Sequence, residues 1–322
     1  MSSPVSLTHR AITAAALITA TALALAGCAG STGSTAEEST AKPSSNTVET
    51  LYGKVTVPAN PKRIVALDFP EATALADLGV KPVGIGSYTP ALPAYTDFFK
   101  GIPDDTDKDG LPVPEKIAAQ KPDLIILDDF TSKIEKDRPI YEKLSAIAPT
   151  VVLTWTEAAG SWQDDAEGTA QAIGKTAELK KLRDDYLAHA AEIKKTYADV
   201  LSTHSVDLVS GDASTWFLYG PTSSHGRVLA EAGSRFAAAE DQKDGFVQYS
   251  PEKYSLLQNS DIVIVEANDG IAAKPVTTSP VFANLPASKN GNVFTTPYFF
   301  PSSYQIANAL LDDFENALKN AK

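Results

Sequence analysis

The stretch TAELKKLRDDYLAHAAEIKKTYADVL, residues 176–201, decides how the chain is organised. Neither proline nor glycine interrupts it, and Thr176 can cap its N-terminus. At 1.5 Å per residue, a helix over this stretch would be about 35–40 Å long, more than the width of a small domain. It is either a surface helix of one domain or a rod that joins two. Its apolar side chains recur every three or four residues and so share one face: Leu179, Leu182, Tyr186, Ala190, Ile193, Tyr197 and Val200.

Short apolar strands alternate with helices on both sides of this stretch. Strands that are apolar on both faces and alternate with helices indicate a parallel sheet that helices cover on both sides. The sequence therefore predicts one α/β lobe before the long helix and another after it. The strands are expected at residues 62–67, 80–86, 123–127 and 150–154 in the first half, and at 205–209, 215–218, 261–265 and 292–295 in the second.

Two short patterns of the first half return in the second half, in the same order. LADLG at residues 75–79 returns as LAEAG at residues 229–233. The second pattern is PEK followed by an aspartate just before an apolar strand, and it occupies residues 114–123 and 251–261. This repetition favours two similar lobes, and hence a bridging helix over a surface helix.

The composition is that of a folded protein with room for two domains. The chain has 322 residues, of which 43% are hydrophobic and 21% charged, and its formal net charge is −12. So acidic a protein repels phosphate backbones, which argues against a nucleic-acid partner. With Cys28 as the single cysteine there is no internal disulfide, so the fold depends on its hydrophobic core.

Residues 1–27 have the pattern of a targeting signal. Arg10 precedes an apolar run at residues 11–26 that is too short to span a bilayer comfortably. The run leads into Leu-Ala-Gly-Cys, which resembles the lipobox of bacterial lipoproteins and makes Cys28 the expected lipidation site. A free cysteine after an ordinary cleavage site is the alternative. Residues 28–47 are rich in Ser, Thr and Gly and predict a flexible tether.

Several motifs from about residue 50 to the C-terminus follow one another in a recognisable order. They include PKRIV at 61–65, LGVKPVG at 78–84, KPDLII at 121–126, IAPT at 147–150 and YGPTSS at 219–224. In these motifs the chain resembles the substrate-binding lipoproteins of ABC importers for ferric siderophores, heme and cobalamin. Its residues 67–69 and 144–150 are most similar to the binders of iron hydroxamates and ferric citrate.

The resemblance implies an α/β fold of two Rossmann-like lobes bridged by one long α-helix, as in class III periplasmic binding proteins. It places the N-terminal lobe at residues 48–162, a connecting segment with the bridging helix at 163–201, and the C-terminal lobe at 202–322. The ligand would lie in the cleft between the lobes, and the bridging helix would limit how far they open.

The resemblance also implies one surface carboxylate per lobe that docks on arginines of the permease. The chain departs from the family here, because the usual positions hold Thr73 and Ala230. Asp77 and Glu231 occupy equivalent places in the repeated LADLG and LAEAG patterns. They are therefore the expected docking residues, with ordinary solvated acids as the alternative.

The ligand site is expected beyond the carboxyl ends of the strands, where open α/β sheets bind their ligands. Aromatic residues are frequent in these segments and suit a large, partly apolar chelate. Some of them are equally suited to packing the lobe cores. The best basic candidates lie at helix starts. The ligand-binding residues expected on these grounds are Tyr88, Arg138, Trp155, Trp216, Arg227 and Tyr298.

The charge of the strand-end segments indicates the kind of chelate. A binder of anionic catecholates would present a cluster of Arg or Lys, and these segments contain neither. The sequence therefore favours a neutral or cationic ligand such as a ferric hydroxamate. The acidic residues at the strand ends are Asp128, Asp129, Glu266 and Asp269.

Other functions remain as alternatives. His225 with Tyr298 would suit heme iron, so a heme or cobalamin receptor of the same family is one alternative. Ser224 beside His225 would suit a surface hydrolase, although the chain lacks the usual hydrolase motifs. Residues 105–110 copy the first half of an EF-hand, but Lys116 replaces its final glutamate, so a solvated loop is expected rather than a weak Ca²⁺ site.

The sequence thus predicts a receptor on the extracytoplasmic face of a bacterial cell membrane, anchored there by lipid. It would capture a ferric siderophore and deliver it to an ABC permease. Because the chelate's own oxygens would coordinate the iron, neither a resident cofactor nor a protein-bound metal is expected. Enzymatic activity is not expected either, and the protein should act as a monomer.

Overall fold

The computed structural model describes residues 45–86, 92, 95–155, 161–267 and 273–322. The long helix is present but ends earlier than predicted: α6 (Thr176–Thr196) is followed by the separate helix α7 (Ala198–Thr203). The break lies at Tyr197, whose backbone leaves the helical region (φ −105°, ψ 23°). The hydroxyl of Tyr197 donates to Glu315 at 3.0 Å. A tertiary contact thus accompanies the break, which helix propensity alone does not predict.

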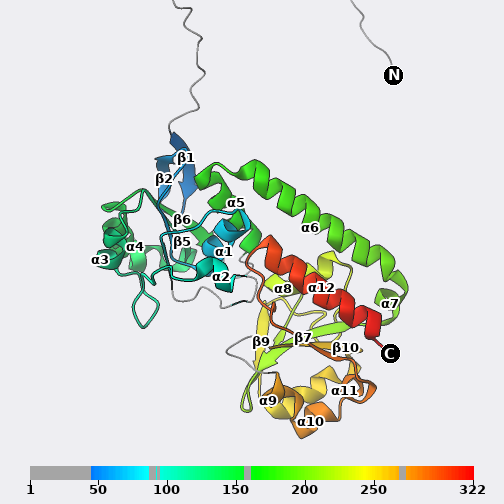
Figure 1. The fold of residues 1–322 in the computed structure, drawn as a ribbon. Coiled ribbons are helices and arrows are strands. Elements are labelled where there is room, and N and C mark those ends of the chain that lie inside the picture. Colours follow the sequence, from blue (N-terminus) through cyan, green and yellow to red (C-terminus); the bar gives the residue numbers. More distant parts are fainter. Residues whose placement is uncertain (1–44, 87–91, 93–94, 156–160, 268–272) are drawn as a thin grey trace, which may run out of the picture. The chain divides into compact units, whose positions relative to one another are not determined.

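The apolar face of α6 is buried as the spacing predicts. Leu179, Tyr186, Ala190 and Ile193 are all buried. The helix packs on α5 (Trp162–Ile173), α8 (Ser224–Glu231) and α12 (Tyr304–Asn320), which belong to different halves of the chain (Figure 1). It is therefore a bridge between two lobes, and the hypothesis of a surface helix is wrong.

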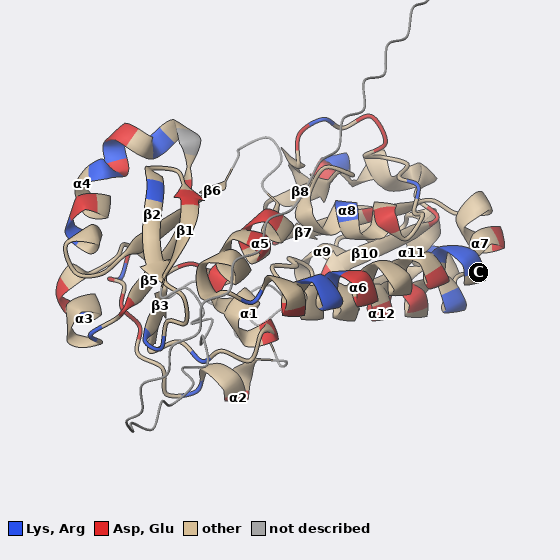
Figure 2. Ribbon diagram, turned by 90° about the horizontal axis from the view of Figure 1, so that it is seen from above, with Lys and Arg blue, Asp and Glu red and all other residues tan. Residues whose placement is uncertain are grey.

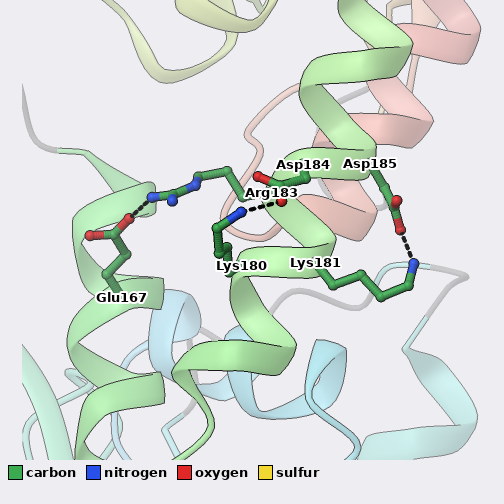
Figure 3. A network of polar contacts seen from close by, with 6 residues as sticks. All are labelled: Glu167, Lys180, Lys181, Arg183, Asp184 and Asp185. Carbon is green, nitrogen blue, oxygen red and sulfur yellow. Dashed lines mark hydrogen bonds and ion pairs between the residues drawn. The ribbon is translucent and has the colours of Figure 1, made fainter.

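The outer face of α6 is charged along its length (Figure 2). Lys180 and Lys181 pair with Asp184 and Asp185, one helical turn later, at 2.5 Å each (Figure 3). Arg183 also pairs with Glu167 of α5. These exposed pairs contribute only about 0.3–0.5 kcal/mol each, so burial of the opposite face holds the helix in place.

The described chain before α6, which we call the N lobe, contains a parallel sheet in the order β4-β3-β5-β6. All four strands lie within a few residues of the predicted positions: β3 (Ile64–Ala66), β4 (Gly84–Ile85), β5 (Leu124–Phe130) and β6 (Thr150–Trp155). Between and after them come α1 (Phe69–Asp77), α2 (Thr96–Phe99), α3 (Pro114–Ala119), α4 (Ile134–Ser145) and α5.

An antiparallel hairpin precedes this sheet. It consists of β1 (Ser45–Thr50) and β2 (Gly53–Pro58), with Val48 and Val57 buried in the core. The strand β1 begins inside the predicted tether of residues 28–47, so the ordered structure starts earlier than the polar composition suggests. The rest of the tether and the signal segment lie outside the described residues.

The C lobe, residues 206–322, contains a mixed sheet in the order β11-β10-β7-β8-β9. Its parallel strands are β7 (Val206–Gly211), β10 (Ile262–Glu266) and β11 (Val293–Thr296). The strands β8 (Trp216–Tyr219) and β9 (Phe246–Tyr249) are antiparallel to their neighbours, so a second all-parallel sheet was a wrong prediction. Only residues 212–215 connect β7 to β8, too few for a parallel crossover. The remaining helices of the lobe are α8, η2 (Pro251–Asn259), α9 (Lys274–Thr277), α10 (Pro280–Ala283), α11 (Pro286–Asn290) and α12.

The repeated sequence patterns correspond to equivalent positions in the two lobes. Asp123 accepts backbone N–H groups at the start of β3, from Lys62 at 2.7 Å and Arg63 at 2.8 Å. Asp261 accepts the backbone N–H of Ser205, just before β7, at 2.8 Å. Asp123, just before β5, thus holds the start of the neighbouring strand β3. Asp261, just before β10, does the same for β7.

The two lobes share a hydrophobic core. One cluster of buried apolar side chains runs through both lobes and α6, and residues 42–322 form one compact unit. At its centre the rings of Trp162, Tyr186 and Tyr304 lie 4.9–6.1 Å apart and join α5, α6 and α12. The lobe boundaries at residues 162 and 201 stay predictions.

Candidate ligand-binding site

Carboxylates gather at the edge of the N lobe where β5 ends. Asp68 occupies the N-cap position of α1 without a capping hydrogen bond, and Glu71 lies in the first turn of that helix. Asp128 lies in β5 and Asp165 in the first turn of α5. One oxygen each of Glu71, Asp128 and Asp165 lies within 4.8 Å of the other two. Burial raises the pKa of Asp128 and of Asp165 to about 8, and it raises that of Glu71 well above its usual range. Repulsion by neighbouring acids is a second, smaller cause of these shifts. Burial and repulsion therefore favour the protonated, uncharged form of these carboxyls.

An aromatic cluster lies where the chain leaves β11. The imidazole of His225 packs against Tyr219 at 4.4 Å, Phe299 at 4.3 Å and Phe300 at 5.1 Å between ring centres. Phe246 of β9 lies 6.0 Å from Tyr219. Phe246 and Phe300 remain 57% and 38% exposed, which offers an apolar surface to a ligand. The sequence did not predict a role for Phe246, because the residues of β9 alternate weakly.

Phe300 should contribute to ligand capture more than to folding. We expect Phe300→Ala to weaken chelate binding about 5- to 30-fold, as loss of a partly exposed aromatic contact costs about 1–2 kcal/mol. Fluorescence titration measures the affinity and urea unfolding the stability. Leu256→Ala, at a residue 43% exposed on η2, is the matched control and should bind normally. If Phe300→Ala and Leu256→Ala bound the chelate equally well, Phe300 would not be a ligand contact.

The structure does not bring the six predicted ligand residues together. Trp216 is fully buried, its indole N–H donates to the carbonyl of Ser250 at 2.9 Å, and it stacks on Tyr254 at 4.8 Å. It is a core residue, so the expectation of a ligand contact is not supported for it. Trp155 is half-buried at the end of β6, as a strand-end position should be. Tyr88 lies outside the described residues.

The remaining candidates occupy three different places. Arg138 is half-exposed on α4, pairs with Glu135 at 2.9 Å and lies over the ring of Tyr52 at 5.4 Å. Arg227 is half-buried on α8 and lines a groove shared by α5, α6 and α8. Tyr298 is half-buried in another groove, beside α6 and α12. Sequence position near a strand or helix end did not predict where these side chains point.

The two predicted docking carboxylates also differ. Asp77 accepts hydrogen bonds from Tyr95 at 2.6 Å, from Ser303 at 3.1 Å and from the backbone N–H of Gln305 at 3.0 Å. It therefore fastens α1 to the N-terminus of α12, and burial raises its pKa. Glu231 is exposed on α8 and accepts a hydrogen bond from Tyr186 at 2.5 Å. Of the two, only Glu231 is an exposed acid on the protein surface.

The alternatives built on His225 and on the aspartate-rich loop find no support. His225 is fully buried among aromatic rings, so its imidazole is not presented to a heme iron. In the loop, Asp107 accepts the backbone N–H groups of Asp109 and Leu111, and the ammonium of Lys116 donates to the carbonyl of Thr106 at 2.6 Å. A cation of the protein thus lies where an EF-hand needs a carboxylate.

His225 should make the protein sensitive to acid. Burial lowers its pKa to about 3, against about 6.5 in an unfolded chain, so the native state binds fewer protons between these values. Stability therefore falls as the pH drops below 6.5, by about 3 kcal/mol at pH 4.5 from this residue alone. The variant His225→Phe keeps an aromatic ring, and the carboxylates titrate equally in both proteins. Between pH 7 and pH 4.5, urea unfolding should show wild type losing about 3 kcal/mol more of its free energy of unfolding than His225→Phe does. A constant gap would contradict the assignment.

Two α/β lobes bridged by one helix, with functional groups gathered at strand ends, define a two-lobed α/β binding protein. The chain belongs to the periplasmic binding protein family, whose model matches residues 64–298. This confirms the predicted fold class and the resemblance to substrate-binding lipoproteins of iron-siderophore ABC importers. The family consists of substrate-binding proteins, so the protein is a transport component and not an enzyme.

Similar proteins include lipoproteins of Bacillus subtilis. The chain is 30% identical over 292 residues to a putative ABC transporter substrate-binding lipoprotein, covering 84% of this chain and 87% of the relative. It is 31% identical over 291 residues to a probable siderophore-binding lipoprotein of the same organism, covering 83% and 85%. Across the described residues, no helix combines the length and the apolar character needed to cross a membrane.

Solved structures of the same fold include proteins named for siderophores. A siderophore periplasmic binding protein from the fuscachelin gene cluster of Thermobifida fusca is 25% identical, with a TM-score of 0.74 over 82% of this chain and 98% of that one. Staphylococcus aureus SirA complexed with staphyloferrin B is also 25% identical, with a TM-score of 0.67 over 85% and 98%.

Proposed function

We propose that this protein binds a ferric siderophore between its lobes, on the outer side of the cell membrane, and delivers it to an ABC permease. The names of its relatives support an iron chelate as the ligand, since they include a probable siderophore-binding lipoprotein and an Fe(3+)-citrate-binding protein, which is 29% identical over 282 residues. The exposed rings of Phe246 and Phe300 support a ligand with apolar surface. The chelate would supply all the iron ligands, and the protein would act as a monomer.

Within this class we propose a chelate of the hydroxamate type. The observation that carries this choice is the end of β5, where the half-buried Asp128 and Asp129 are acidic and neither Lys nor Arg is present. A tri-anionic catecholate complex would find no Lys or Arg to pair with in this segment, whereas a neutral or cationic hydroxamate complex needs none. Glu266 is buried in the C lobe, and Asp269 lies outside the described residues, so neither adds to this argument.

A fluorescence-quench titration over several chelate classes tests the choice. Ferric hydroxamates should bind with submicromolar affinity, and ferric catecholates, ferric citrate and heme more weakly by tenfold or more. Tight binding of a ferric catecholate, with no binding of hydroxamates, would overturn the hydroxamate proposal and leave the siderophore class standing. Heme retained with its absorption spectrum through purification would favour the heme alternative instead.

The lipid anchor at Cys28 is a further part of the proposal. We expect Cys28→Ser to move the protein from the membrane fraction of the producing cell to the soluble fraction, since one thioether-linked diacylglycerol holds the mature chain. Membrane fractionation with immunoblotting measures this change. A variant that stays in the membrane fraction would show that another element holds the protein there. Glu231 remains the candidate for docking on the permease.

A further inference from the structure

We propose that Glu71, Asp128 and Asp165 form a binding site for a hard divalent cation such as Ca²⁺ in the N lobe. The three side chains come from separate elements, α1, β5 and α5, of which α1 and α5 pack directly on one another. One carboxylate oxygen from each lies within 4.8 Å of the others. Oxygen ligands of Ca²⁺ lie about 2.3–2.6 Å from the ion, so oxygens on opposite sides of it are about 4.6–5.2 Å apart. The spacing therefore permits all three to share one ion.

Three buried carboxylate oxygens of this site have no hydrogen-bond partner among the described residues. Glu71 is 0% exposed, and neither of its oxygens has a hydrogen-bond partner among the described residues. The same holds for Oδ2 of Asp165, which is 1% exposed. Burying an unpaired carboxylate costs several kcal/mol, and three that face one another cost more. A bound cation would remove both the desolvation penalty and the repulsion.

No ion pair of the described residues supplies the missing positive charge. Lys133 is the cation with the most influence on Asp128, and its side chain is exposed, with Nζ 4.3 Å from the centre of the Phe130 ring. Acids in the first turn of a helix are ordinary when water solvates them, because the helix N-terminus is partly positive. Glu71 and Asp165 hold such positions but are buried away from water. The helix N-termini alone therefore do not explain why these carboxylates are stable there.

The ligand chemistry selects the class of metal. The three groups are carboxylates, without thiolate or imidazole, which suits Ca²⁺, Mg²⁺ or Mn²⁺ better than Zn²⁺ or copper. Ca²⁺ accepts irregular geometry and completes its shell with water, whereas Mg²⁺ requires a near-ideal octahedron at 2.0–2.1 Å. Occupation would tie α1, β5 and α5 together at the strand-end edge of the N lobe. The inference does not depend on which chelate the protein binds.

Thermal unfolding of the full chain, freed of metal with a chelator, tests the site. Added Ca²⁺ should raise the melting temperature by about 5 °C at a hundredfold excess over Kd and further with the logarithm of its concentration, and calorimetry should show one ion per chain. Glu71→Gln should fold and lose the Ca²⁺ response. Asp165→Asn is a second variant with the same expectation. Asp107→Asn, in the exposed aspartate-rich loop, is the matched control and should respond as wild type does.

Three results would overturn the inference. Wild-type protein that responds to none of Ca²⁺, Mg²⁺ and Mn²⁺ at millimolar concentration would mean that the carboxylates hold protons instead. An undiminished Ca²⁺ response in both Glu71→Gln and Asp165→Asn would place the ion elsewhere. A response lost in Asp107→Asn alone would assign it to the loop. None of these results bears on siderophore binding, which is measured separately.

Discussion

Replacing Trp162 with alanine is expected to lower the free energy of unfolding by about 3–5 kcal/mol, the largest stability effect that we predict for a side-chain truncation. Trp162 is 1% exposed and packs edge-on against Tyr304 at 4.9 Å and Tyr186 at 6.1 Å. Its removal leaves a cavity where α5, α6 and α12 meet, and a close-packed interior refills such a cavity only in part. The indole N–H has no hydrogen-bond partner among the described residues, so lost packing accounts for the effect.

Urea unfolding of Trp162→Ala and Trp162→Phe would check this expectation. Phenylalanine keeps a ring in contact with both tyrosines and should restore about half of the loss. Trp155→Ala, at a half-buried position of an edge strand, is the matched control and should cost less than Trp162→Ala. If the two alanine variants were equally stable, the junction of the three helices would not be where the lobes are joined.

Proline at Ala190 is expected to cost about 3 kcal/mol or more and to weaken ligand capture as well. Ala190 is 2% exposed in the interior of α6, where proline removes a backbone hydrogen bond and clashes with the preceding turn. Because α6 contacts α5 of one lobe and α8 and α12 of the other, a kink there changes how the lobes face one another. Ala190→Gly should cost only about 1 kcal/mol and bind nearly normally, since it keeps the hydrogen bond.

The matched control for Ala190→Pro is Ala177→Pro. Ala177 lies in the first turn of α6, where proline removes no intrahelical hydrogen bond and its fixed φ suits the helix. This variant should therefore fold and bind as wild type does, as measured by urea unfolding and chelate titration. If Ala190→Pro also folded and bound normally, α6 could not be the element that sets the geometry of the lobes.

The architecture could be predicted from the sequence because its signals are local and periodic. The apolar face of α6 repeats at helical spacing over Leu179, Tyr186, Ala190 and Ile193, and burial of that face is what the structure shows. The parallel strands of both lobes are continuous apolar runs. The weaker elements escaped prediction: β1 has few apolar residues, and β9 alternates weakly. The strand β8 was predicted near its place, but not its antiparallel direction, which follows from the connection to β7 being too short for a helix.

The site could be predicted less well, because it depends on side-chain directions. Trp216 and Trp155 both lie near a strand end, yet only Trp155 has an exposed part. Asp128 was expected as an acid at the ligand site, but nothing in the spacing links it to Glu71 and Asp165, which precede and follow it by tens of residues. These three meet only through the packing of α1, β5 and α5, a tertiary arrangement that local patterns do not encode.

We expect the protein to capture an intact ferric chelate between its lobes, and a titration with three forms of one trihydroxamate siderophore would check this. The ferric and gallium complexes have the same charge and shape, so both should bind with one chelate per chain and submicromolar Kd. The metal-free siderophore, which is not folded around an ion, should bind at least about tenfold more weakly. Failure of every ferric chelate, of any class, to saturate the folded protein would mean that it is not a siderophore receptor.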